Sequence, residues 1–141
     1  LRHKTHQYQD VYDFVNACYQ SHNNLLLSIN DCHLNKHIGN IKLGPCDFIS
    51  KESGISLFIG NKDYWKKGYA TRAINLLSNY GFFEIKLDKI VASAYSENLA
   101  SLRAFFKVGF KEDKVFVKSK ILRGKKSDVI QVACYKKDFL A

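Results

Sequence analysis

One segment of the chain carries residue types that together could bind a phosphate group. Residues 57–71 place a short apolar run, a compact loop and the start of a helix-favouring stretch in direct succession. Amide N–H groups at the start of a helix attract anions, because they carry the positive end of the helix dipole. Gly68 allows close approach of the backbone, and Lys66 and Lys67 add positive charge. The segment is therefore predicted to cradle a pyrophosphate.

The residues after Gly68 keep this loop accessible. Ala70 is small, and the hydroxyl of Thr71 can donate a further hydrogen bond. The loop has neither the GxxxxGK[ST] pattern of nucleotide-hydrolysing loops nor the GxGxxG pattern of dinucleotide folds. On its own, the pattern KKGxA fits a plain helix start with two solvated lysines equally well, so its assignment depends on a second motif.

The second motif occupies residues 98–110, with the sequence NLASLRAFFKVGF, after an apolar stretch at 90–95. Together the two blocks resemble motifs A and B of the GNAT N-acetyltransferase family. The similarity is greatest to the RimJ/RimL-like ribosomal-protein acetyltransferases, in which a tryptophan occupies the position of Trp65. The resemblance covers residues 38–135 and implies transfer of an acetyl group from acetyl-CoA to an amine.

The resemblance also implies how the co-substrate acetyl-CoA is held. The strand before Gly60 is expected to splay from the strand at 90–95, with pantetheine in the gap and the pyrophosphate on residues 66–71. Asn98 matches a family asparagine beside the cofactor arm, and Lys107 is expected to reach the phosphorylated adenosine end. The cofactor-binding residues implied are Phe58 and Ile59 (through their backbone groups), Trp65, Lys66, Lys67, Gly68, Tyr69, Ala70, Thr71, Asn98, Ser101, Phe105 and Lys107.

Ser101 is the implied general acid, which would protonate the departing thiolate. Many relatives use a tyrosine at the position of Phe105, which has no proton to donate, whereas RimL-like proteins use a serine that matches Ser101. A helix-capping role for Ser101 is an equally weighted alternative.

The general base is less well defined. Two family glutamates are replaced here, one by Gly54 and one by Lys120. The candidates are Asp128, which matches a family acidic position, and Glu52, with Glu97 as a further carboxylate. Each also fits a solvated surface group, and a water relay would need no dedicated base. A catalytically weak CoA-binding protein on the same fold is therefore retained as an alternative.

The apolar periodicity predicts the elements that position these groups. Helices are predicted at 8–21, 69–84 and 98–107, and strands at 24–29, 38–43, 55–60, 89–95, 113–121 and 128–136. Asn30-Asp31, Gly44-Pro45 and Ser53-Gly54 are the expected turn formers in the first half of the chain. The fold class predicted is α/β (α+β with a mixed sheet). With the resemblance, this becomes a GNAT acyl-CoA N-acyltransferase fold with a mostly antiparallel sheet, splayed between the fourth and fifth family strands, and helices on both faces.

Length and composition limit the remaining possibilities. The 141 residues, 46% hydrophobic and 25% charged, fit a single N-acetyltransferase domain at 1–141. A start at Leu1 and the lack of methionine favour a chain without its first N-terminal elements. No apolar run is long enough for a membrane span. Four widely spaced cysteines predict reduced thiols in a cytoplasmic protein, and His3 with His6 is too small a set for a metal site.

The net charge of +9 permits a nucleic acid, an acidic protein surface or polyanionic CoA as partner. A basic cluster near the last hairpin supports an RNA- or ribosome-binding module as the alternative, although a charged hairpin is more often a solvated face. For an acetyltransferase, the acceptor is left open among a protein N-terminus, an amino sugar nucleotide and another small amine. A homodimer is also allowed. The cluster consists of Lys118, Lys120, Arg123, Lys125 and Lys126.

Overall fold

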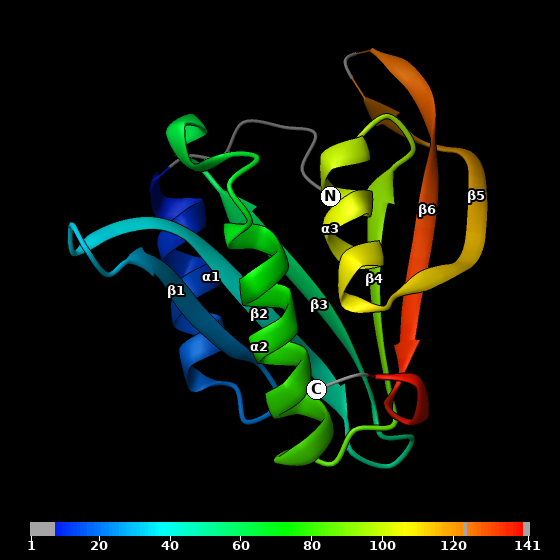
Figure 1. Ribbon diagram of the computed structural model, residues 1–141, viewed down its shortest axis with the longest axis horizontal. Helices are drawn as coiled ribbons and strands as arrows, with labels where there is room; N and C mark the ends of the chain where they lie inside the picture. Colours follow the sequence, from blue (N-terminus) through cyan, green and yellow to red (C-terminus); the bar gives the residue numbers. More distant parts are fainter. Residues whose placement is uncertain (1–7, 123, 140–141) are drawn as a thin grey trace.

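A mixed six-stranded sheet lies at the centre of the structure, in the strand order β1-β2-β3-β4-β6-β5 (Figure 1). The structure is a computed structural model that describes residues 8–122 and 124–139, so His3, His6 and Arg123 lie outside the described part. The strands are β1 (Leu25–Asp31), β2 (Lys36–Asp47), β3 (Glu52–Ile59), β4 (Lys89–Tyr95), β5 (Lys111–Leu122) and β6 (Lys125–Tyr135). The helices are α1 (Tyr8–Gln20), α2 (Tyr69–Phe83) and α3 (Leu99–Val108), with short 3-10 helices η1 (Lys62–Tyr64) and η2 (Lys136–Asp138).

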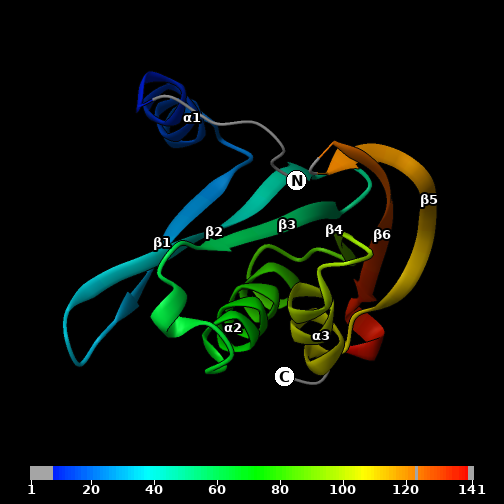
Figure 2. The same ribbon diagram turned by 90° about the horizontal axis from the view of Figure 1, so that it is seen from above.

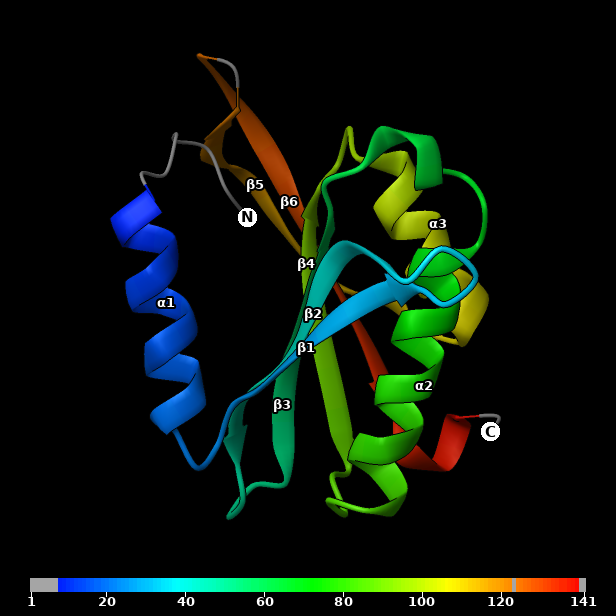
Figure 3. The same cartoon turned by 90° about the vertical axis from the view of Figure 1, so that its left-hand side faces the viewer.

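Helices lie on both faces of the sheet, as the sequence predicted (Figures 2 and 3). α2 and α3 lie side by side on one face and enclose the hydrophobic core, which includes Ile74, Phe105 and Ile90. α1 lies on the other face, and among its described side chains only Cys18 is buried. No helix in the described residues is long and apolar enough to cross a membrane.

β3 and β4 run parallel and separate after a short paired stretch. Their register ends at the pair formed by Gly54 and Val91, although β3 continues to Ile59 and β4 to Tyr95. The other strand pairs are antiparallel. The predicted mixed fold and its splayed strand pair are therefore confirmed. Both α2 and α3 begin at the open end of this pair (Figure 1).

The predicted elements are present, but two turns are displaced. The chain turns at 32–35 and 48–51, whereas Asn30-Asp31 and Ser53-Gly54 lie inside β1 and β3. The Gly44-Pro45 pair, joined by a cis peptide bond, lies inside β2, where the register shifts. A Cβ on Gly44 would lie 2.8 Å from the Cα of Asn24. The glycine therefore allows close packing of β2 against the segment just before β1 instead of forming a turn.

Candidate cofactor and active site

The unpaired half of β3 presents backbone groups to the gap between β3 and β4. The amide of Gly60 donates to the carbonyl of Ile38 on β2 at 3.1 Å. Because backbone groups alternate in direction along a strand, those of Phe58 also face β2, and those of Leu57 and Ile59 face the gap. A Cβ on Gly39 of β2 would collide with the Phe58 carbonyl, which agrees with this direction. The gap thus offers the amide and carbonyl of Leu57 and the amide of Ile59 to an extended ligand, and Leu57 is absent from the sequence prediction.

The loop at 60–68 joins the end of β3 to α2 and is fastened to the strand. The indole N–H of Trp65 donates to the carbonyl of Ile59 at 2.7 Å. Two loop residues have left-handed backbone conformations, Lys66 with φ of 61° and Gly68 with φ of 86°. Such conformations are uncommon for residues other than glycine, so the attachment of Trp65 helps to hold a loop shape that a free chain seldom adopts.

The start of α2 leaves several amide groups open. Its first backbone hydrogen bond runs from the amide of Arg72 to the carbonyl of Gly68 at 3.0 Å. The amides of Tyr69, Ala70 and Thr71 precede it and point out of the helix end. Gly68 supplies no side-chain cap to them. Since the side chains of Lys66 and Lys67 are exposed beside this end, the local charge suits a phosphate group.

Ser101 lies in the first turn of α3, which also begins at the open end of the gap. The Oδ1 atom of Asn98 accepts the amide N–H of Ser101 at 3.2 Å, so Asn98 is the N-cap of this helix. The Ser101 hydroxyl is therefore not needed as the cap. Ser101 is half-buried and shares the inward stripe of the helix with Phe105 and Val108.

Two other predicted residues on α3 lie away from the open end. Phe105 is 2% exposed and packs edge-on against Phe110, with ring centroids 5.1 Å apart. It belongs to the hydrophobic core. Lys107 is exposed in the last turn, at the opposite end of α3 from Asn98 and Ser101.

Two of the three candidate bases, Asp128 and Glu52, lie at opposite ends of the sheet. The carbonyl of Asp128 on β6 accepts the amide N–H of Ser96, just after β4, at 3.0 Å. The half-buried side chain of Asp128 shares the face of Val132 and Cys134, which pack into the core beneath the helices. Asp128 is thus near the start of α3. Glu52 begins β3 at its paired end, about 23 Å of strand from Ile59.

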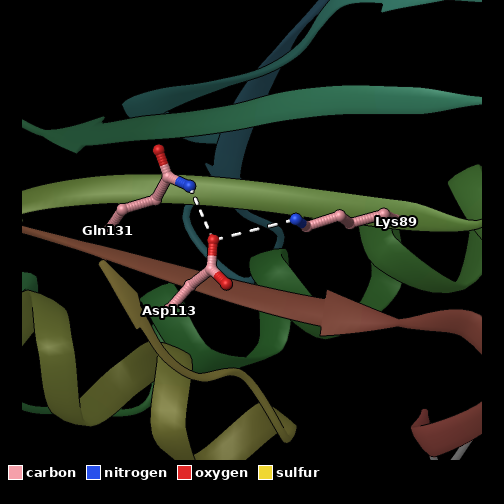
Figure 4. Close-up of polar contacts among 3 residues, drawn as sticks. All are labelled: Lys89, Asp113 and Gln131. Atoms are coloured by element: carbon pink, nitrogen blue, oxygen red, sulfur yellow. Dashed lines mark hydrogen bonds and ion pairs between the residues drawn. The ribbon is translucent and has the colours of Figure 1, made fainter. Parts of the chain in front are cut away.

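Lys89, the register partner of Glu52 on β4, belongs to a polar cluster with Asp113 and Gln131 (Figure 4). Asp113 accepts a hydrogen bond from Gln131 at 2.8 Å and forms an ion pair with Lys89 at 3.7 Å. The pKa of Lys89 is raised, first by a hydrogen bond with Tyr135 and also by the charge of Asp113. Among the described residues, no group of three or more His, Cys, Asp or Glu could hold a metal ion.

One polar contact of the loop is absent from the sequence prediction. The hydroxyl of Tyr64 donates to the Oδ2 atom of Asp31 at 2.6 Å. This bond raises the pKa of Tyr64 to about 12 and is the main cause that lowers the pKa of Asp31. The two residues are 33 positions apart, so no local pattern links them. The only signal in the sequence is an aromatic residue within the suspected phosphate-binding loop.

Comparison with known proteins agrees with this geometry. The protein-family model described as acetyltransferase (GNAT) domain matches residues 2–111, which is most of the chain. The chain is 28% identical over 102 residues to the uncharacterized N-acetyltransferase p20 of Bacillus licheniformis, covering 69% of this chain and 57% of p20. It is 36% identical over 61 residues to the uncharacterized N-acetyltransferase YnaD of Bacillus subtilis, covering 43% of this chain and 36% of YnaD. The chain belongs to the GNAT acetyltransferase family, although it matches these relatives over little more than half of their length or less.

Solved structures show the same fold. The spermidine N-acetyltransferase of Vibrio cholerae in complex with CoA and spermine superposes with a TM-score of 0.88 at 19% identity, covering 99% of this chain and 82% of that chain. A point variant of the spermidine N-acetyltransferase from the same organism gives a TM-score of 0.84 at 20% identity, covering 95% of this chain and 78% of that chain. At this level of identity, the similarity establishes the architecture only.

Proposed function

We propose that this protein transfers the acetyl group of acetyl-CoA to a primary amine. The observation that carries the proposal is the juxtaposition of an uncapped helix start with a splayed strand pair at the same end of the sheet. The helix start suits a pyrophosphate, and the strand gap suits an extended chain that carries amides. CoA combines the two matching parts, a pyrophosphate and an extended arm that carries amides. Membership of the acetyltransferase family adds direct support.

The residues present fit the parts of acetyl-CoA. The amides of Tyr69, Ala70 and Thr71, with Lys66 and Lys67, would hold the pyrophosphate. The backbone groups of the second half of β3 would pair with the pantetheine amides, as an added strand would. Phe58 turns its own backbone groups to β2, and the carbonyl of Ile59 already accepts from Trp65, so the backbone groups of Leu57 take this part. Asn98 would approach the cofactor from the start of α3, and Trp65 would hold the loop.

The chemistry requires few protein groups. The thioester of acetyl-CoA supplies an activated acetyl group, which a neutral amine can attack directly. The amide of Ile59 is the candidate donor to the carbonyl oxygen. Ser101 is the candidate acid for the departing thiolate, and Asp128, with or without a water molecule, is the candidate base for the amine proton. Glu52 and Lys107 lie apart from these groups, and Phe105 contributes packing.

The acceptor is a separate part of the proposal. The motif resemblance supports a RimJ/RimL-like enzyme, whereas the similar solved structures are enzymes that act on spermidine. A protein N-terminus, a polyamine, an amino sugar nucleotide and another small amine are therefore the classes to test. A cytoplasmic location is also proposed, supported by the four cysteines, which are all free thiols.

A thiol-release assay with one acceptor of each class tests this function. We expect acetyl-CoA turnover that depends on one class of amine. A Ser101→Ala variant should lose about a hundredfold in kcat with little change in the KM for acetyl-CoA, because it removes only the acid. Ser93→Ala, an exposed change on β4, is the matched control. Full activity of Ser101→Ala would remove Ser101 from the mechanism, and no turnover with any class would contradict the proposed activity.

A further inference from the structure

Asp31 and Tyr64 join two distant segments of the chain at the edge of the proposed cofactor site. Asp31 is the last residue of β1 and is 7% exposed. Tyr64 is the last residue of η1, in the loop that precedes α2. Their 2.6 Å separation is typical of a hydroxyl that donates to a carboxylate, which is among the stronger hydrogen bonds in proteins. The bond ties the loop to the edge strand of the sheet.

The ring of Tyr64 also contacts the residues on both sides of Gly68. It packs edge-on against the ring of Tyr69, with centroids 5.1 Å apart, and Tyr69 is the first residue of α2. The Nζ atom of Lys67 lies 6.0 Å from the centroid of the Tyr64 ring. Tyr64 therefore contacts the residue before Gly68 and the residue after it. The second oxygen of Asp31 accepts the amide of His33 at 3.0 Å, which fixes the carboxylate.

We infer that Asp31 and Tyr64 are positioning residues that hold the loop at 60–68 in its cofactor-binding shape; this inference rests on the proposed function. Lys66 and Gly68 both need left-handed backbone conformations, which an unrestrained loop populates only in part. A ligand binds more weakly when only a fraction of the protein has the competent shape. Loss of the bond should therefore weaken acetyl-CoA binding while Ser101 and Asp128 keep their places.

The test compares Tyr64→Phe with the parent protein, because this change removes one hydroxyl and keeps the ring. We expect the Kd and the KM for acetyl-CoA to rise about tenfold. The kcat and the KM for the amine should stay within about twofold, because the catalytic groups are untouched. Tyr19→Phe removes a hydroxyl from a residue that is 88% exposed on α1, and it should change neither constant.

Asp31→Asn is the second variant. It should weaken binding less than Tyr64→Phe, because its amide oxygen can still accept from the tyrosine. The double variant should bind no worse than Tyr64→Phe alone, because residue 31 has no bond to Tyr64 left to lose once the hydroxyl is gone. If Tyr64→Phe does not fold, the Kd of Asp31→Asn for acetyl-CoA takes its place. A Kd above that of the parent would support the inference, and a parent-like Kd would overturn it.

Two results would overturn this inference. Parent-like binding by a folded Tyr64→Phe variant would do so, even if its melting temperature fell, because the bond would then serve stability alone. An additive loss in the double variant would show that the two residues act independently. If the parent itself fails to bind acetyl-CoA, the proposed function fails as well, so that outcome is distinct from failure of the inference alone.

Discussion

The protonation state of the Asp31 carboxylate is expected to affect the stability of the fold at low pH. The hydroxyl of Tyr64 and the amide of His33 both lower the pKa of Asp31 below its ordinary value of 3.8. A carboxyl whose pKa is lower in the folded state stabilises the fold above the ordinary value, and this contribution is lost as the pH falls through the lowered pKa. We expect the urea midpoint to fall below about pH 4, and to fall less steeply in Asp31→Asn. Identical pH profiles for the two proteins would contradict this role.

The cysteines differ in their exposure, which predicts their reactivity. Cys32 is exposed in the turn after β1, whereas Cys18, Cys46 and Cys134 are buried. Burial raises the pKa of the Cys134 thiol to about 11, and the thiolate is the reactive form. We expect a disulfide reagent at pH 8 to modify one thiol rapidly in the native protein and the other three slowly. Cys32→Ser should abolish the rapid phase, and its persistence would refute the assignment.

At the scale of single residues, the sequence allowed predictions from local patterns but did not reveal contacts between distant residues. The phosphate-binding role of Lys66 to Thr71 stays a prediction, and the sequence alone could make it because phosphate binding depends on local backbone and charge. The role of Asn98 as N-cap and the burial of Phe105 depend on which way a helix faces, so the sequence left the function of Ser101 open between acid and cap. The contact between Asp31 and Tyr64 required the fold.

At the scale of the elements, the N-terminal cap of α3 is expected to contribute to the stability of the fold. Asn98 caps α3 through the amide of Ser101. Replacing an asparagine N-cap by alanine costs about 1 kcal/mol, which corresponds to about 4 °C in Tm for a domain of this size. We therefore expect Asn98→Ala to melt at a lower temperature in calorimetry. Asn98→Asp keeps an oxygen acceptor and should melt like the parent, and equal melting of all three would show that the cap is unimportant.

The sequence predicted the order of elements because apolar periodicity reports which face of each element is buried. It placed two turns wrongly because Asn30-Asp31 and Ser53-Gly54 are turn-forming pairs that lie inside β1 and β3, where they pair with β2 and β4. Gly44-Pro45 is a third expected turn that lies inside a strand. Its glycine leaves room for Asn24, at a point where the register between β2 and β3 shifts. Pairing between strands overrides such local preferences.

At the scale of the whole molecule, the open end of the β3–β4 pair is where the sheet, α2 and α3 meet. The amides of Leu57 and Ile59 face the gap, whereas those of Phe58 and Gly60 face β2. We expect hydrogen exchange at Leu57 and Ile59 to be fast in the free protein and to slow when acetyl-CoA is added. Phe58 and Gly60 serve as internal controls, and should be protected in both states. Unchanged exchange at Leu57 and Ile59 under saturation would place the pantetheine elsewhere.

The central claim is that the start of α2 binds the pyrophosphate of acetyl-CoA, and Gly68 offers the most direct test. A Cβ at this position would have no neighbour within 4 Å, so a side chain meets open space, and the strain comes only from the positive φ. Asparagine and aspartate tolerate this conformation similarly, and they differ in one negative charge.

The first measurement is therefore a calorimetric titration of acetyl-CoA into the parent, Gly68→Asn and Gly68→Asp proteins, with the melting temperature of each as a check on folding. We predict micromolar binding to the parent, weaker binding to Gly68→Asn, and binding to Gly68→Asp that is at least about tenfold weaker again, because the carboxylate repels the phosphates. Equal affinity in the two variants, or no binding to the parent, would contradict the central claim.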